Sequence, residues 1–255
     1  MVWLGVVLAL GTSMSWAAGN ILTQRVGRLV GPPRAMLWSM AAGALIALPC
    51  AVILDARTAP LSLSLVAWLV AAGIAGVMAY IGLFVAFANK GLTVAVPIVS
   101  SWPLFAIGFS VALFGESVGG RQWIGVAAVL GGVLFVALPS ASRASSPSGD
   151  DVEAGSPPGD RWGLPAALAS SFGFGIMIPA MGRVAPATGA FGATVIVFSI
   201  GIALSLVAGR VAKVSFAAPP RSAWPLVLAT GLAETTGFVT VALARRFAPM
   251  ALVAP

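Results

Sequence analysis

The chain consists of two related halves, and this internal repeat is the feature that most constrains its fold. At an offset of 158 residues, which places Gly5 on Gly163, the sequence aligns with itself without a gap. Identical residues recur along the comparison, at Leu10/Leu168, Ser13/Ser171, Arg25/Arg183, Gly31/Gly189, Gly43/Gly201, Gly73/Gly231 and Pro97/Pro255. The first copy continues beyond Pro97 through two more predicted helices, whereas the second copy stops at the matching position. We therefore expect a duplicated folding unit whose second copy is incomplete.

The composition predicts an all-α integral membrane protein. Apolar residues make up 59% of the chain and charged residues 8%, against roughly 25% charged in an ordinary soluble domain. A helix needs about 20 apolar residues to cross a bilayer. Segments of this kind occur at 3–23, 35–54, 65–88, 94–114, 123–139, 162–182, 190–208 and 224–243. A ninth begins near Pro249, so about nine helices are expected in the chain.

The number of spans in one copy predicts how the two copies are related. A complete copy has five spans, and because this number is odd the second copy enters the membrane from the opposite side. We therefore expect two inverted five-helix repeats on a ten-helix plan, at residues 1–139 and 162–255. Residues 140–161 are rich in Ser, Pro and Gly and hold four of the seven acidic residues, which predicts a flexible linker.

Charge and composition exclude several classes of function. The net charge is +7, but the basic residues lie singly or in small groups in the loops, so nucleic-acid binding is not expected. The chain has no histidine and one cysteine, which argues against the common metal sites, against cofactors and against an enzyme. We expect the chain to lie in the cell (inner) membrane. The cytoplasmic loops would hold nine Lys and Arg residues if the N-terminus is outside and five if it is inside. This difference favours an outside N-terminus but is too small to settle the orientation.

Several local motifs occur in order along the first copy. They are Leu10-Gly11-Thr12-Ser13-Met14-Ser15-Trp16, then Tyr80 with Phe84 and Ala86-Phe87, then Ser100-Ser101-Trp102-Pro103, and finally Phe114-Gly115-Glu116-Ser117 followed by Gln122, Gly125 and Gly131-Gly132. Together they resemble the EamA-type members of the drug/metabolite transporter superfamily, and the Gly-Glu turn before a Gln-x-x-Gly helix is the most specific of them. The resemblance covers essentially the whole chain outside the linker. It implies a ten-helix transporter, of which this chain is a C-terminally truncated form.

Glu234 is the strongest candidate for a functional residue. It lies in the middle of the span at 224–243, where insertion of an acid costs about 2.5–3.5 kcal/mol. Acids at that depth usually face a cavity and act in proton or ion pathways, and the adjacent Thr235 and Thr236 could hydrogen-bond the carboxyl group or a substrate. The alternative is a protonated carboxyl that only holds two helices together.

Other polar and aromatic residues fall inside predicted spans. On the first helix Thr12, Trp16, Asn20 and Thr23 are spaced by four, four and three residues, which predicts one face turned toward a pore. Tyr80 lies mid-helix, where its hydroxyl group needs a partner. In the fourth span two prolines remove backbone hydrogen bonds next to a polar-aromatic group, so the region is either part of the pathway or only a kink. These residues are Pro97, Pro103, Ser100, Ser101 and Trp102.

Together with these features, the resemblance implies a multi-pass membrane transporter that exports small metabolites or drugs by alternating access, with protons as a candidate coupling ion. Its partners would be a small-molecule substrate and the lipid bilayer, and a homodimer is left open. One alternative is an uncoupled facilitator or a lipid-linked-sugar flippase in which Glu234 is structural. Another is a non-transporting truncated fragment. The resemblance does not separate one substrate from another, because members of such a family share a fold rather than a substrate.

Overall fold

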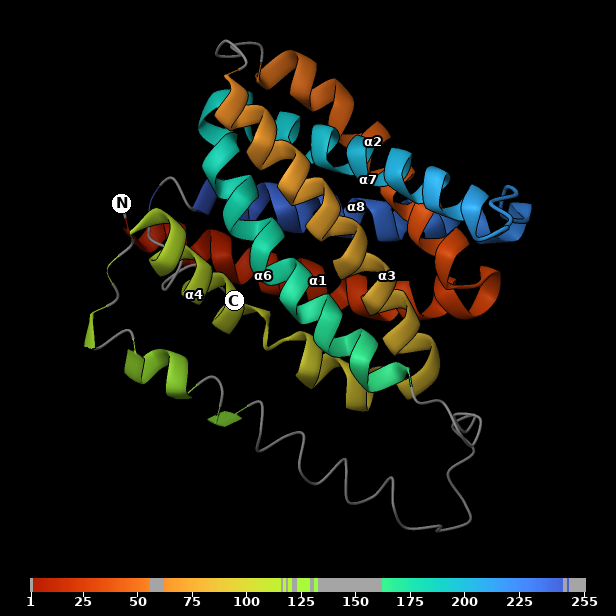
Figure 1. Ribbon diagram of the computed structural model, residues 1–255, viewed down its shortest axis with the longest axis horizontal. Coiled ribbons are helices and arrows are strands. Elements are labelled where there is room, and N and C mark those ends of the chain that lie inside the picture. Colours follow the sequence, from red (N-terminus) through yellow and green to blue (C-terminus); the bar gives the residue numbers. More distant parts are fainter. Residues whose placement is uncertain are drawn as a thin grey trace.

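A computed structural model describes residues 2–55, 62–115, 117, 119–120, 123–128, 131–132, 162–244 and 247. In these residues the chain is helical and has no strand (Figure 1). The helices are α1 (Val2–Val30), α2 (Pro32–Leu54), α3 (Leu63–Val99), α4 (Trp102–Phe114), α6 (Gly163–Thr188), α7 (Ala190–Val211), the 3-10 helix η1 (Arg221–Ala223) and α8 (Trp224–Ala244). The linker, the ninth span and most of the fifth span predicted from sequence lie outside the described residues.

Six helical stretches in the described part of the chain are long and apolar enough to cross a membrane, which confirms the all-α membrane class. One of them, Leu63–Phe114, has 52 residues, more than twice the length that one crossing needs. This stretch folds back at Gly91, whose φ of 70° is open to glycine at little cost. Trp68 and Phe114 lie equally far from Gly91 in sequence, and their rings contact each other at 5.1 Å. The stretch is therefore a hairpin of two antiparallel spans, as predicted for 65–88 and 94–114.

The returning arm of this hairpin is interrupted near its middle. α3 ends at Val99, Ser100 and Ser101 form a turn, and α4 begins at Trp102. Pro97 lies inside α3, and Pro103 is the second residue of α4, where a helix has no backbone hydrogen bond to lose. The two prolines therefore flank the break.

Contacts between the two copies are reciprocal. A Cβ atom built on Gly43 would meet Phe198 and Thr235, and one built on Gly201 would meet Met40 and Val77, which are the same two positions 158 residues earlier. At another crossing Ser15 Oγ donates to the carbonyl of Ala233 at 2.8 Å. The matching positions are Gly173 and Ala75, and a Cβ on Gly173 would lie 2.8 Å from the Ala75 carbonyl oxygen. Each copy thus packs on the other through equivalent surfaces.

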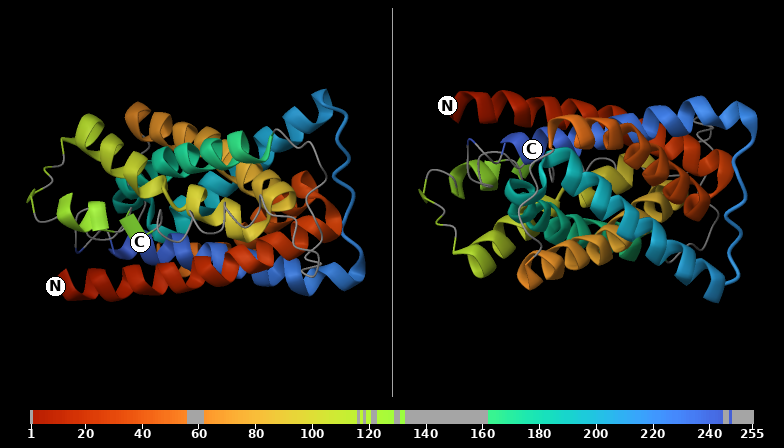
Figure 2. Two further views of the ribbon diagram at one scale, coloured as in Figure 1. Left: turned by 90° about the horizontal axis from the view of Figure 1, so that it is seen from below. Right: turned by 90° about the horizontal axis from the view of Figure 1, so that it is seen from above.

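The pairs of helices that pack most closely join one copy to the other. α1 lies along α8, as both views of Figure 2 show, α3 lies along α6, and α2 packs against both α7 and α8. Small residues let these helices approach closely. A Cβ on Gly82 would lie 2.5 Å from the Ala166 carbonyl oxygen, and one on Gly231 would lie 2.7 Å from the Gly43 nitrogen.

Polar contacts hold both ends of α2. At one end Asp55 Oδ2 accepts a hydrogen bond from the Gly192 nitrogen at 2.9 Å, in the first turn of α7. A carboxylate at this position also interacts favourably with the helix dipole. At the other end Arg34 donates to the carbonyls of Ala217 and Ala218 at 3.0 and 2.8 Å. These contacts fix α2 against the second copy, next to the helices that enclose the cavity described below.

Candidate functional site

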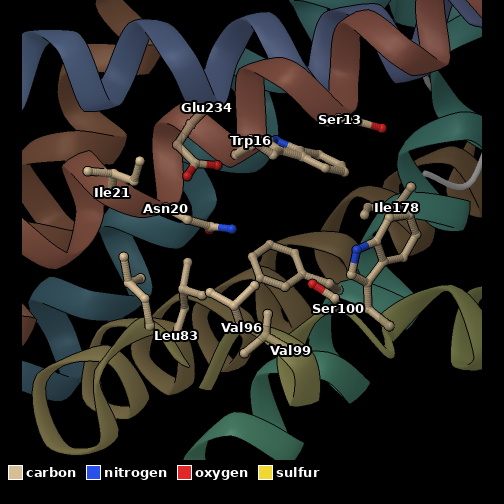
Figure 3. A pocket seen from close by; sticks show the side chains of 14 residues that line it. Ser13, Trp16, Asn20, Ile21, Leu83, Val96, Val99, Ser100, Ile178 and Glu234 are labelled. Atoms are coloured by element: carbon tan, nitrogen blue, oxygen red, sulfur yellow. The ribbon is translucent and has the colours of Figure 1, made fainter. Parts of the chain in front are cut away.

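A cavity of 320 Å³ lies between helices of the two copies (Figure 3). The fourteen described residues that line it come from α1, α3, α4, α6, α8 and the turn at Ser100. They are mostly apolar or aromatic, with polar groups from Ser13, Asn20, Ser100 and Glu234. Among these described lining residues Glu234 is the ionisable one, and no side chain is basic. Pockets with apolar walls and a few convergent polar groups are typical of small-molecule sites.

Glu234 is buried at the centre of α8, of which it is the eleventh of 21 residues. Its side chain is 4% exposed. Within the described part of the chain, the Tyr80 hydroxyl group donates a hydrogen bond to Oε2 of this carboxyl group at 3.0 Å. The other oxygen lies over Gly19, where a Cβ atom would be 3.3 Å from Oε1. Gly19 thus leaves the space between α1 and α8 that the carboxyl group occupies.

The equivalent crossing in the other half contains no acid. There Gly76 stands at the position of Glu234, and Met177 stands at the position of Gly19. A Cβ on Gly76 would lie 2.9 Å from the Met177 sulfur atom. The large side chain therefore comes from α6 at this crossing and from α8 at the other. As a result, the carboxyl group among the described lining residues comes from one of these two crossings and not from the other.

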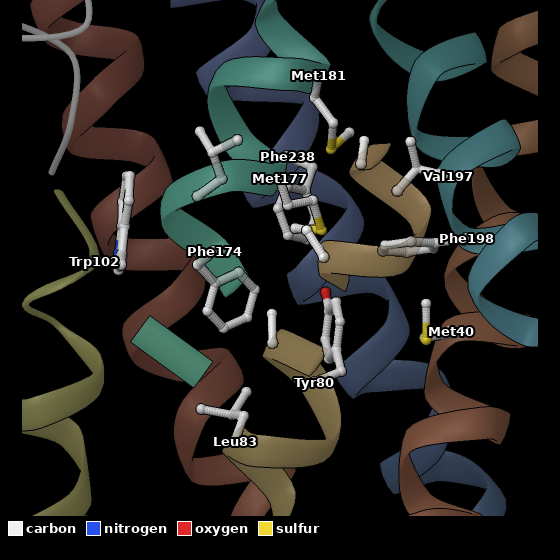
Figure 4. Packing of buried hydrophobic residues seen from close by; sticks show 14 of the residues in the cluster. Met40, Tyr80, Leu83, Trp102, Phe174, Met177, Met181, Val197, Phe198 and Phe238 are labelled. Atoms are coloured by element: carbon white, nitrogen blue, oxygen red, sulfur yellow. The ribbon is translucent and has the colours of Figure 1, made fainter. Parts of the chain in front are cut away.

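Aromatic rings enclose the carboxyl group and the cavity. The Trp16 ring contacts the Trp102 ring at 5.7 Å with an interplanar angle of 85°, and it contacts the Phe238 ring at 5.3 Å. Tyr80 contacts Phe174 at 5.4 Å and lies in the same buried cluster as Phe238 (Figure 4). Edge-to-face pairs of this kind are favourable beyond the area that they bury. They hold the walls of the cavity in fixed positions.

Most of the predicted site residues come together here. Glu234, Trp16, Asn20, Ser100 and Trp102 line the cavity, and Tyr80 joins them through its hydrogen bond to Glu234. In Figure 3 the Glu234 carboxyl group points toward the Asn20 side chain, which itself extends into the cavity. These residues come from four separate segments of the chain, so the site exists only in the folded protein.

Other predicted residues lie away from the cavity. Thr235 donates to the Gly43 carbonyl at 3.1 Å, and Thr236 is exposed on the far side of α8. Ser101 donates to the Ile98 carbonyl at 2.7 Å, and its hydroxyl lies 2.9 Å from that of Ser171. On α1 Thr12 lies 2.8 Å from the hydroxyl of Thr240, and Thr23 is buried without a hydrogen-bond partner among the described residues.

The sequence prediction did not include the apolar part of the lining. Leu83, Val96 and Val99 come from the two arms of the hairpin, and Phe174 and Ile178 come from α6. The repeat contains a signal for the last two, since Phe174 is the counterpart of Trp16 and Ile178 is the counterpart of Asn20. Residues at equivalent positions of the two copies thus line the cavity together.

The sequence is similar to known transporters. Residues 3–138, more than half of the chain, match the model of the EamA-like transporter family. The uncharacterized transporter sll0355 of Synechocystis sp. is 32% identical over 127 residues, which is 49% of this chain and 38% of the relative. The chain thus aligns with less than half of the length of this curated relative.

Proposed function

Because the chain belongs to the EamA-like transporter family, we propose that it moves a small molecule across the membrane by alternating access through the cavity at Glu234. The main observation behind this proposal is a cavity, lined by both copies, whose described lining includes the buried carboxyl group of Glu234 at the middle of a membrane-spanning helix. Secondary transporters bind substrate near the bilayer midplane, where their repeats meet.

The reciprocal contacts support two copies related by a two-fold axis. Gly82 lies against Ser170 and Gly76 against Met177, so α3 and α6 run antiparallel. α1 and α3 run in the same direction because α2 lies between them in the chain. α1 is therefore antiparallel to its counterpart α6, which favours an axis in the membrane plane and an inverted repeat. Rocking of one copy against the other would expose the cavity to each side in turn.

The buried carboxyl group supports proton coupling. An unpaired charge at the middle of a membrane is costly, so the carboxylate must be neutralised either by a proton or by a bound cation. The Tyr80 hydroxyl at 3.0 Å can donate to the ionised form when the proton has left. A proton that enters from outside and leaves on the other side would then drive the substrate out. Glu234 would thus release its proton when the substrate binds and take up a proton when the substrate leaves.

Proteoliposomes that contain the pH dye pyranine test this proposal. A panel of small metabolites and drugs is added outside, and a transported compound changes the internal pH in the wild type. Glu234→Gln keeps the shape of the side chain but removes the titrating group, so we expect it to abolish the pH change. Asp55→Asn is a matched control, since its side-chain oxygen can still accept from Gly192 outside the cavity. Full substrate-driven proton flux in Glu234→Gln would contradict the coupling role. Substrate movement without a pH change in the wild type would favour an uncoupled facilitator.

A further inference from the structure

We infer that the substrate is a small organic monocation, held by Glu234 and by the indole rings of Trp16 and Trp102. This inference rests on the proposed function, because it identifies the chemical class that the same cavity carries. It depends on four properties of the described lining, which are its charge, its aromatic walls, its size and its asymmetry.

The charge of the lining favours a cation. Glu234 forms no ion pair with a basic side chain of the described residues, and its hydrogen-bond donor there is the neutral hydroxyl of Tyr80. The basic residues of α1, Arg25 and Arg28, are exposed near its C-terminal end. A substrate carboxylate or phosphate would find no basic partner among the described lining residues, and burial of an unpaired charge is costly. A cation, in contrast, would neutralise a carboxylate that the described residues leave without a basic partner.

The aromatic walls recognise positive charge in a second way. Trp16 and Trp102 both line the cavity, and their rings stand nearly perpendicular at 85°, so they form two adjacent walls. The electron-rich face of an indole attracts a cation, by up to about 2 kcal/mol or more when the site is dry. Phe238 supports Trp16 at a ring distance of 5.3 Å and keeps it in place. The aromatic walls and the carboxylate therefore act on the same ligand charge.

The remaining lining sets the size and the number of charges. A volume of 320 Å³ is at the lower end of the range of about 300–1,000 Å³ for ligand pockets. Leu83, Val96 and Val99 form an apolar wall, which suits a hydrocarbon or aryl body rather than a sugar. The equivalent of Glu234 in the other half is Gly76, so the repeat supplies one acid rather than two. The site thus fits an amine or a quaternary ammonium ion with one positive charge and an apolar body.

Three probes of similar size and different charge test this inference. They are the cation 4-hydroxyphenyltrimethylammonium, its uncharged carbon isostere 4-tert-butylphenol, and the anion 4-hydroxybenzoate. Isothermal titration calorimetry with the purified full chain in detergent measures their affinities. We expect the cation to bind at least about tenfold more tightly than its isostere, a difference of about 1.4 kcal/mol. We expect no saturable binding of the anion.

Variants separate the carboxylate from the aromatic walls. Glu234→Gln should weaken the cation about tenfold or more and leave the uncharged isostere unchanged, whereas Glu234→Asp should retain the preference for the cation. Trp102→Leu should weaken the cation about 5- to 30-fold, from about 1–2 kcal/mol of cation–π attraction. Trp68→Leu is the matched control, because Trp68 packs against Phe114 and does not line the cavity. Thermal unfolding of each variant identifies loss of the fold.

The outcomes separate this inference from the proposed function. Equal affinity of the wild type for the cation and its isostere would overturn the inference, as would unchanged cation binding in Glu234→Gln. If proteoliposomes then transport a neutral or anionic compound, the transporter proposal stands without the cation. If the cation binds as expected but nothing is transported, the site is correct and the proposed function is wrong.

Discussion

A single methyl group added at Gly237 tests whether helix packing sets the shape of the site. A Cβ on Gly237 would lie 2.5 Å from Cδ1 and 2.8 Å from Cε2 of Trp16 and closer still to Nε1, whereas optimal carbon contacts are about 3.5–4.0 Å. The indole would have to move by about 1 Å. Phe238 and Trp102 flank this ring at 5.3 and 5.7 Å, so it cannot move freely.

The expected effect of Gly237→Ala is larger on transport than on stability. Overpacking of a well-packed region costs about 1–3 kcal/mol. A displacement of about 1 Å of a positioning group can reduce a rate about 100-fold, so we expect a loss of substrate-driven proton flux of about 10- to 100-fold in proteoliposomes. Gly11→Ala on α1 is the control, because its methyl group would meet nothing within 4 Å among the described residues. If Gly237→Ala transports as well as Gly11→Ala, Trp16 does not form a fixed wall of the site and the reasoning is refuted.

Three further substitutions have expected outcomes. Tyr80→Phe removes the hydrogen bond to Glu234 and should lower the free energy of unfolding by about 0.6–1.7 kcal/mol, measured by chemical unfolding in detergent, and should slow proton flux. Gly173→Ala would place a Cβ 2.7 Å from a backbone nitrogen of α3 and should lower the free energy of unfolding by about 1–3 kcal/mol. Gly108→Ala is the control, because its Cβ would meet nothing within 4 Å in the described part of the chain, and equal melting temperatures of the two variants would contradict this packing. Arg34→Ala should increase hydrogen exchange in the segment before η1, and unchanged exchange would show that its two hydrogen bonds to that segment are dispensable.

The repeat and the spans could be predicted because they depend on local composition and periodicity. The face of α1 that lines the cavity was predicted only in part, for a geometric reason. Each residue turns an α-helix by about 100°, so a spacing of four drifts by about 40°. This rotation turns Trp16 and Asn20 toward the cavity. Thr12 and Thr23 are 11 residues apart, so they point in nearly the same direction, and both are buried on the packed side of α1. A spacing rule that treats four positions as one face misses this rotation.

The pairing of Glu234 with Tyr80 shows where sequence reasoning stops. The two residues are 154 positions apart, and neither carries a signal for the other. The repeat does place Gly76, the counterpart of Glu234, one turn before Tyr80 on the same helix. The register that places Glu234 within reach of Tyr80 depends on close contacts such as that of Gly231 on α8 with Gly43 on α2. Such contacts follow from the packing of whole helices.

Cysteine accessibility at Ser100 tests alternating access most directly. Cys50 is the single cysteine, so Cys50→Ala gives a background in which Ser100→Cys reports on the cavity alone. A membrane-impermeant maleimide is applied to right-side-out and inside-out vesicles, at acidic and at alkaline pH. Alternating access predicts that the side from which the cysteine is labelled changes with pH. Labelling from one and the same side in all conditions, or from neither side, would contradict the account.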